Sequence, residues 1–234
     1  MCKMIGGSMK YNDLKRFKNI HSDKCGIAFA TGPSLNKFDF NKLPGNRDDY
    51  ITTGVNDMVY YDKIDLDYYF CGDHKNNTGS EITGIPYLEQ IKLYKKNRLK
   101  GEMFCNVYVD DNEMPSHHFT KSEALEIGAN ICGQITGYGT QHIKKDIHNN
   151  AFYNHSIIYS SLQFILYTGI QKLYLVGCDA GGGSSYLEKG KEWPDSIISF
   201  WGDFKEFLER EYPNVKVISI NPNNLRGWFD DEIM

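Results

Sequence analysis

The chain has 234 residues, of which 41% are hydrophobic and 24% are charged, as is typical of a globular protein. The formal net charge of −4 argues against a dedicated nucleic-acid-binding protein, because such proteins carry an excess of Lys and Arg. No apolar run approaches the roughly 20 residues that a transmembrane helix needs. The N-terminal segment also lacks the apolar core of a signal peptide. We therefore expect a cytoplasmic protein, which can still work at the inner face of a membrane.

The first half of the chain alternates strand-like and helix-like segments. Residues 25–30 predict a buried strand, which ends in the turn Ala30-Thr31-Gly32-Pro33-Ser34-Leu35. Residues 35–42 predict a short helix or turn, and part of 81–100 is predicted to be helical. Three further strands are predicted, at 50–55, 67–71 and 103–109.

Residues 110–153 show little periodicity and are rich in Asn, Gly and His. A long irregular segment in a compact domain is often a lid or a binding loop. We expect a lid-like segment or insertion here, and a surface excursion is the alternative.

The second half of the chain has clearer patterns. Apolar spacing predicts a helix over 156–168 that stops at Gly169, and 172–177 predicts a buried strand. A second helix is predicted over 198–212, and a final strand over 215–220. This alternation implies one Rossmann-like α/β domain over residues 1–234, a mostly parallel sheet with helices on both faces.

The six cysteines form no CxxC pair and no zinc-like spacing with His. Several lie in strand-like runs, so we predict buried free thiols in a reducing compartment and no metal site.

Candidate ligand-binding residues stand where predicted strands and helices end. In open α/β sheets, ligands bind at the carboxyl ends of the strands. Gly32 and Pro33 shape the turn after the first strand, and Ser34 can donate to a phosphate or cap the next segment. The alternative is a plain strand-to-helix turn.

The other candidates follow the same rule. Asn56 can contact a ribose or a phosphate, or form a local Asx turn. Ser156 is the first residue of the long helix, where it can cap the helix and also bind a phosphate, because both roles use the positive end of the helix. Asp179 can bind a sugar hydroxyl or a metal, or can accept backbone N–H groups of the glycines that follow. Asn221 and Asn223 can contact the base or leaving phosphate, or shape an Asn-Pro turn.

Five segments, in order along residues 20–228, resemble the bacterial sialyltransferase family that includes the Campylobacter enzymes. They are also similar to flagellin nonulosonate transferases and archaeal hydroxymethylpterin diphosphokinase-like proteins. The segments are Gly32-Pro33-Ser34-Leu35, Gly54-Val55-Asn56-Asp57, the run from Ser156 to Asp179, Gly183-Ser184-Ser185-Tyr186, and Ile220-Asn221-Pro222-Asn223-Asn224-Leu225.

The resemblance implies a glycosyltransferase that uses a nucleotide-sugar, with a sialic-acid-like sugar as one candidate, and a surface-glycan acceptor, without a required cofactor. The family places a catalytic His after the Gly-Ser-Ser-Tyr loop, but no His follows His155 in this chain. The predicted catalytic residues are therefore His155, Asp179 and Tyr186. The predicted nucleotide-binding residues are Gly32, Pro33, Ser34, Asn56, Ser156, Asn221 and Asn223. Thr31 stands where the family usually has Asn, so the turn does not identify the nucleotide as CMP.

Two alternatives remain open from the sequence. One is a Mg²⁺-dependent pyrophosphokinase of the hydroxymethylpterin type, which would transfer diphosphate from ATP. The other is a non-catalytic nucleotide-binding homologue that has lost its base. A homo-oligomer is also left open.

Overall fold

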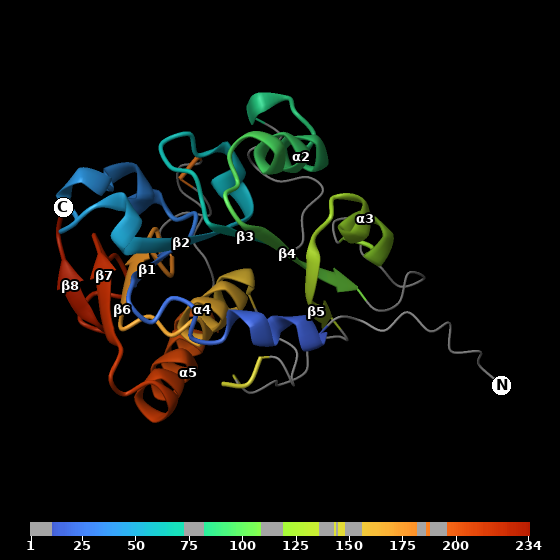
Figure 1. Cartoon of the computed structure of the whole chain (residues 1–234). Coiled ribbons are helices and arrows are strands. Elements are labelled where there is room, and N and C mark those ends of the chain that lie inside the picture. Colours follow the sequence, from blue (N-terminus) through green and yellow to red (C-terminus); the bar gives the residue numbers. More distant parts are fainter. Residues whose placement is uncertain are drawn as a thin grey trace.

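The strands form one parallel sheet. The computed structural model describes residues 11–72, 82–108, 119–135, 143, 145–147, 156–181, 186–187 and 196–234. Within these residues the strands are β1 (Cys25–Phe29), β2 (Tyr50–Val55), β3 (Tyr68–Cys71), β4 (Glu102–Tyr108), β5 (Asn130–Ile135), β6 (Lys172–Val176), β7 (Lys216–Ile220) and β8 (Asp230–Glu232). Their order in the sheet is β5-β4-β3-β2-β1-β6-β7-β8, and every neighbouring pair is parallel (Figure 1).

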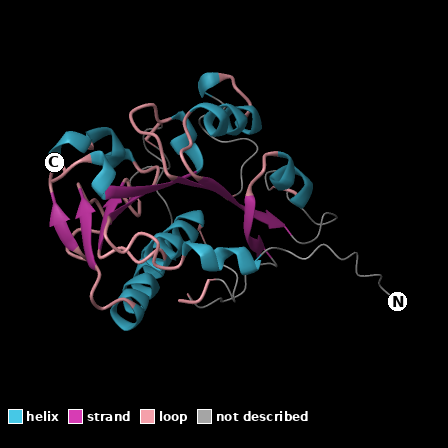
Figure 2. Cartoon of the chain, viewed as in Figure 1, coloured by secondary structure: helices cyan, strands magenta, loops and turns pink. Residues whose placement is uncertain are grey.

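Helices cover both faces of this sheet (Figure 2). The α-helices are α2 (Tyr87–Asn97), α3 (Lys121–Glu126), α4 (Ile157–Tyr167) and α5 (Ser196–Glu211). The 3₁₀ helices are η1 (Tyr11–Phe17), η2 (Pro33–Lys37), η3 (Phe40–Lys42), η4 (Arg47–Asp49) and η5 (Asn56–Tyr60). No helix in the described ranges is long and apolar enough to cross a lipid bilayer.

Two hydrophobic clusters lie on opposite faces of the sheet. Side chains alternate across a strand, so Ala28 of β1 joins one cluster while Ile27 and Phe29 join the other. The first cluster takes its helical side chains from η1, α4 and α5, and the second takes them from η2, η5, α2 and α3. Helix α4 lies at the centre of the first cluster, because all eleven of its residues are buried. The expected layers are therefore confirmed.

Among the α-helices and strands of the described residues, three occur where the sequence predicted none. Helix α3 and strand β5 both lie within residues 110–153, so residues 121–126 and 130–135 are regular structure. Most of the remaining residues of that segment are outside the described ranges. Strand β8 follows β7, although 215–220 was expected to hold the last strand.

The order of the strands creates a switch point between β1 and β6. The chain builds β1 to β5 outward in one direction, and then returns to add β6, β7 and β8 on the other side of β1. Connections after β1 and β6 therefore diverge, and this is where open α/β sheets bind ligands. The turn after β1 and the segment after β6 both begin at this switch point.

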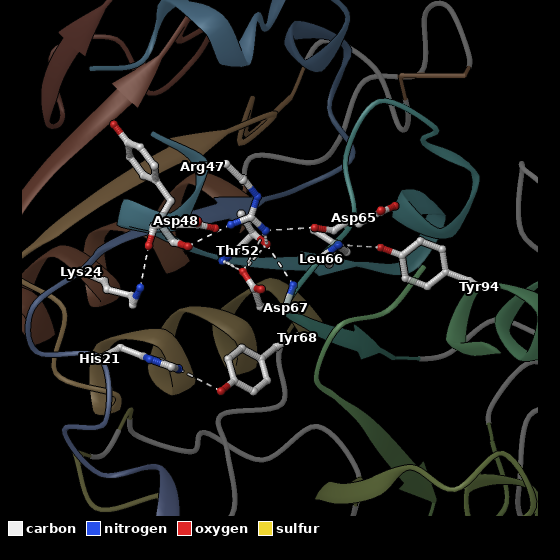
Figure 3. A network of polar contacts seen from close by, with 11 residues as sticks. His21, Lys24, Arg47, Asp48, Thr52, Asp65, Leu66, Asp67, Tyr68 and Tyr94 are labelled. Carbon is white, nitrogen blue, oxygen red and sulfur yellow. Dashed lines mark hydrogen bonds and ion pairs between the residues drawn. The ribbon is translucent and has the colours of Figure 1, made fainter. Parts of the chain in front are cut away.

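The opposite, amino-terminal edge of the sheet is held by a polar network (Figure 3). The Asp67 carboxylate accepts hydrogen bonds from Thr52 N at 2.8 Å and from Arg47 Nη2 at 3.0 Å. Arg47 also donates to the carbonyl oxygens of Tyr50 and Asp65. This network joins the starts of β2 and β3, away from the switch point, and we assign it a structural role.

Candidate functional site

The turn after β1 is bonded directly to the segment after β6. Gly32 N donates to Gly177 O at 2.8 Å, and Ser34 N donates to Asp179 Oδ2 at 2.8 Å. A Cβ atom on Gly32 would lie 2.2 Å from Asp179 Oδ2 and 2.5 Å from Gly177 O. Only glycine allows these two segments to approach so closely. The turn is therefore part of a tight two-loop arrangement at the switch point.

Asp179 is a buried carboxylate at the centre of this arrangement. Its residue is 4% exposed, and its second oxygen, Oδ1, has no hydrogen-bond partner among the described residues. Burial raises the pKa of Asp179, and Ser34 and Lys37 oppose that rise in part. A buried acid with a raised pKa and an unused oxygen is typical of functional sites. Ser34 N is its bonded donor among the described residues. Of the glycines that the sequence allowed as donors, Gly182 and Gly183 lie outside the described residues.

Strained backbone marks the carboxyl ends of three strands. Asn56 follows β2 with φ 43°, Ala180 lies beyond β6 with φ 52°, and Asn221 follows β7 with φ 47°. Non-glycine residues seldom adopt this left-handed conformation, which costs about 1–3 kcal/mol each, and such residues cluster at functional sites. The strain therefore lies at the edge of the sheet where the ligand is expected.

Asn56 bridges the ends of β2 and β3. Its side-chain Oδ1 accepts a hydrogen bond from Gly72 N at 3.0 Å, and its carbonyl oxygen accepts one from the Tyr69 hydroxyl at 2.8 Å. The side chain is therefore bonded to the next strand and not to a local Asx turn.

The segment after β7 packs on the segment after β6. Asn224 N donates to Asp179 O at 3.2 Å, and Asn223 Nδ2 donates to Gly181 O at 3.4 Å. Asn221 Oδ1 accepts from Met234 N at 2.9 Å, whereas its buried Nδ2 has no partner among the described residues. The Asn221 Nδ2 group is therefore a buried donor without a partner among the described residues, while Asn223 uses its amide to hold the loop.

Tyr186 joins the two sides of the site. Its backbone N donates to Thr31 O, and its hydroxyl donates to Asp57 O at 3.1 Å. Burial raises the pKa of the Tyr186 phenol, so it stays protonated and remains a donor. Through these contacts, the loop after β6 is tied to both the β1 turn and η5.

Ser156 stands at the N-cap position of α4 and is exposed, but its side chain makes no capping hydrogen bond. The first turn of α4 lies beside the end of β3, because a Cβ on Gly72 would be 3.1 Å from Ile157 Cβ. The positive end of α4 is therefore near Asn56. His155 lies outside the described residues.

The structure thus brings Gly32, Pro33, Ser34, Asn56, Asp179, Tyr186, Asn221 and Asn223 to one edge of the sheet. Sequence reasoning missed Gly72 and Gly177, each of which directly follows a buried strand. A glycine in that position was the available signal, since Gly177 adopts φ 68°. No group of three or more His, Cys, Asp or Glu side chains arranged as metal ligands occurs in the described part of the chain.

The fold is similar to that of known glycosyltransferases. The sialyltransferase CstII from Campylobacter jejuni, in complex with the substrate analogue CMP-3FNeuAc, matches with a TM-score of 0.50 and 16% identity over 88% of this chain and 85% of that chain. The MAf glycosyltransferase from Magnetospirillum magneticum matches with a TM-score of 0.51 and 9% identity over 98% of this chain, but over only 39% of its own length. No protein-family model matches the chain, and neither does any curated protein sequence.

These likenesses show the fold. The chain has the α/β architecture of the sialyltransferase-like group, as the five sequence segments predicted.

Proposed function

We propose that this protein is a glycosyltransferase that moves a sialic-acid-like sugar from a nucleotide-sugar to a surface-glycan acceptor. The observation that carries the proposal is the junction of Gly32, Ser34 and Asp179 at the switch point between β1 and β6. The glycosyltransferase fold of the neighbours supports it. We place the reaction in the cytoplasm, with the inner face of the membrane as a site of action.

The nucleotide is assigned to the edge formed by β1, β2, β6 and β7. Gly32, Pro33 and Ser34 would approach a phosphate or ribose through the backbone and the Ser34 hydroxyl, which has no partner among the described residues. Asn56 and Asn221 would each supply a side-chain N–H donor. Ser156 would bring the positive end of α4 to a phosphate group, and Asn223 would support the loop that carries Asp179.

The transfer requires a base and a group that stabilises the leaving phosphate. A bond forms between the acceptor oxygen and the anomeric carbon while the bond from that carbon to the phosphate oxygen breaks. The nucleotide leaves with the electron pair, and the hydroxyl proton passes to the base. His155 and Asp179 are the candidate bases, and the raised pKa of Asp179 suits that role. Tyr186 is the candidate donor to the departing phosphate, and in that role its hydroxyl would turn away from the Asp57 carbonyl oxygen to which it donates in the free protein.

Binding of free nucleotides tests the proposal. We would titrate the protein with CMP, CDP, UDP and GDP by calorimetry, and would follow hydrolysis of a panel of nucleotide-sugars. Asp179→Asn should abolish turnover, whereas the control Asp203→Asn, on the exposed surface of α5, should not change it.

Two outcomes would overturn the proposal. One is the absence of both nucleotide binding and nucleotide-sugar hydrolysis. The other is Mg²⁺-dependent ATP binding that EDTA abolishes, with diphosphate transfer to a hydroxymethyl acceptor, which would favour the pyrophosphokinase alternative.

A further inference from the structure

The short helix η5 (Asn56–Tyr60) follows β2 at the edge of the site, and four of its successive carbonyl oxygens are hydrogen-bonded. Three of them accept from side chains that come from different parts of the fold. The acceptor and donor pairs are Asn56 O with Tyr69 Oη (2.8 Å), Asp57 O with Tyr186 Oη (3.1 Å), Met58 O with Tyr61 N (3.1 Å) and Val59 O with Gln90 Nε2 (3.1 Å). The helix is therefore held in place by its surroundings and not by its own length.

The bond to Asn56 continues into a chain of buried hydroxyls. The hydroxyl oxygens of Tyr69 and Tyr87 lie 2.5 Å apart, and both residues are fully buried. A phenol has one hydrogen to donate. Because Tyr69 gives its hydrogen to the Asn56 carbonyl, the Tyr87 hydroxyl must donate to Tyr69. This chain of hydroxyl groups therefore runs from Tyr87, the first residue of α2, through Tyr69 in β3 to Asn56.

Two contacts then fix Asn56, one at its backbone and one at its side chain. Its carbonyl is held by Tyr69, and its side-chain Oδ1 is held by Gly72 N at 3.0 Å. The backbone there has φ 43°, a left-handed conformation that asparagine adopts more readily than other non-glycine residues and that these two contacts hold in place. The remaining amide group, Nδ2, makes no hydrogen bond to a described residue. The contacts thus orient one free amide NH₂ group, which carries two N–H donors.

We propose that Tyr69 and Tyr87 are positioning residues of the nucleotide site, and that their hydroxyl chain holds Asn56 so that its Nδ2 group is set to donate to the nucleotide. This inference rests on the proposed function. Burial raises the pKa of both phenols well above its usual value, so both remain donors throughout the pH range in which the protein would be assayed.

Removal of single hydroxyls tests the chain. Tyr69→Phe should weaken nucleotide binding about three- to tenfold, the effect of losing one buried hydrogen bond. Tyr87→Phe should have a smaller effect, because Tyr69 can still donate to Asn56. The matched control is Tyr94→Phe: Tyr94 is 1% exposed, and its hydroxyl accepts from Leu66 N at 3.0 Å at the other edge of the sheet. That control should bind the nucleotide within about twofold of wild type.

A second background separates positioning from general stability. Asn56→Gly removes the amide but tolerates a positive φ. In that background, Tyr69→Phe should weaken binding no further, since the residue through which it acts is gone. An equal loss in both backgrounds would overturn the proposal, because Tyr69 would then act independently of Asn56.

The free protein gives a readout that does not depend on the nucleotide. In ¹⁵N-labelled protein, Tyr69→Phe should shift the side-chain NH₂ signals of Asn56, and Tyr94→Phe should leave them in place. Unchanged signals in Tyr69→Phe would overturn the proposal. If the wild-type protein binds no nucleotide, the proposed function fails, and these signals alone decide whether the hydroxyl chain holds Asn56.

Discussion

Substitution of Gly32 by alanine tests whether the β1 turn must touch the segment after β6. The new Cβ would lie 2.2 Å from Asp179 Oδ2 and 2.5 Å from Gly177 O, both far inside normal contact distance. The carbonyl belongs to the backbone, so it cannot swing away as a flexible side chain would. The two segments must separate, and the bond from Ser34 N to Asp179 is then lost.

The size of the effect follows from these contacts. Overpacking costs about 1–3 kcal/mol, and we expect the upper end of this range here. In a chain of this length, about 1 kcal/mol lowers the melting temperature by about 2–4 °C. Gly32→Ala should therefore melt about 6–12 °C below wild type and should lose nucleotide binding, as measured by circular dichroism and calorimetry.

A glycine elsewhere provides the control. A Cβ on Gly202 in α5 would meet its nearest neighbour, Trp228 Cζ3, at 3.9 Å, an ordinary contact. Alanine is preferred over glycine in a helix by about 0.5–1 kcal/mol, so Gly202→Ala should melt slightly above wild type. The reasoning is refuted if Gly32→Ala melts within about 1 °C of wild type and binds nucleotide normally.

Three further predictions concern the charge of Asp179, the polar network at the amino-terminal edge of the sheet, and the cysteine thiols. Because burial raises the pKa of Asp179, the stability of the wild-type protein should fall as pH rises through that pKa. Asp179→Asn should therefore have a higher melting temperature than wild type at about pH 7. In thermal denaturation scans, this difference in melting temperature should disappear below the pKa of an unfolded aspartate. Asp67→Ala removes the acceptor of Thr52 N and the carboxylate partner of Arg47, which keeps its bonds to the Tyr50 and Asp65 carbonyl oxygens. It should lower the free energy of unfolding in urea by about 2 kcal/mol, and a change in nucleotide affinity would contradict its structural role. Burial raises the pKa of the Cys178 thiol, so mass spectrometry should show iodoacetamide modifying the partly exposed Cys25 faster than Cys178, and equal rates at these two thiols would contradict this expectation.

Much of the sheet could be predicted because buried parallel strands appear in the sequence as short apolar runs. Residues 50–55 were predicted and are β2, and the runs at 25–30 and 172–177 match β1 and β6 within one residue at the C-terminal end. Strand β8 could not be predicted, since Asp230, Asp231 and Glu232 have low strand propensity. Its pairing with β7 exists only through the tertiary structure.

The sequence by itself determined which residues end the strands, and so placed Gly32, Asn56, Asp179 and Asn221 near a ligand edge. A polar or glycine residue directly after an apolar run carries that information locally. Only the tertiary structure decided which strand ends are neighbours, because the pairing of β1 with β6 joins segments that are distant in the chain. The tertiary structure alone shows that the close approach of Asp179 leaves no room for a Cβ atom at position 32. It also shows that the buried Tyr69 hydroxyl connects Tyr87 to Asn56.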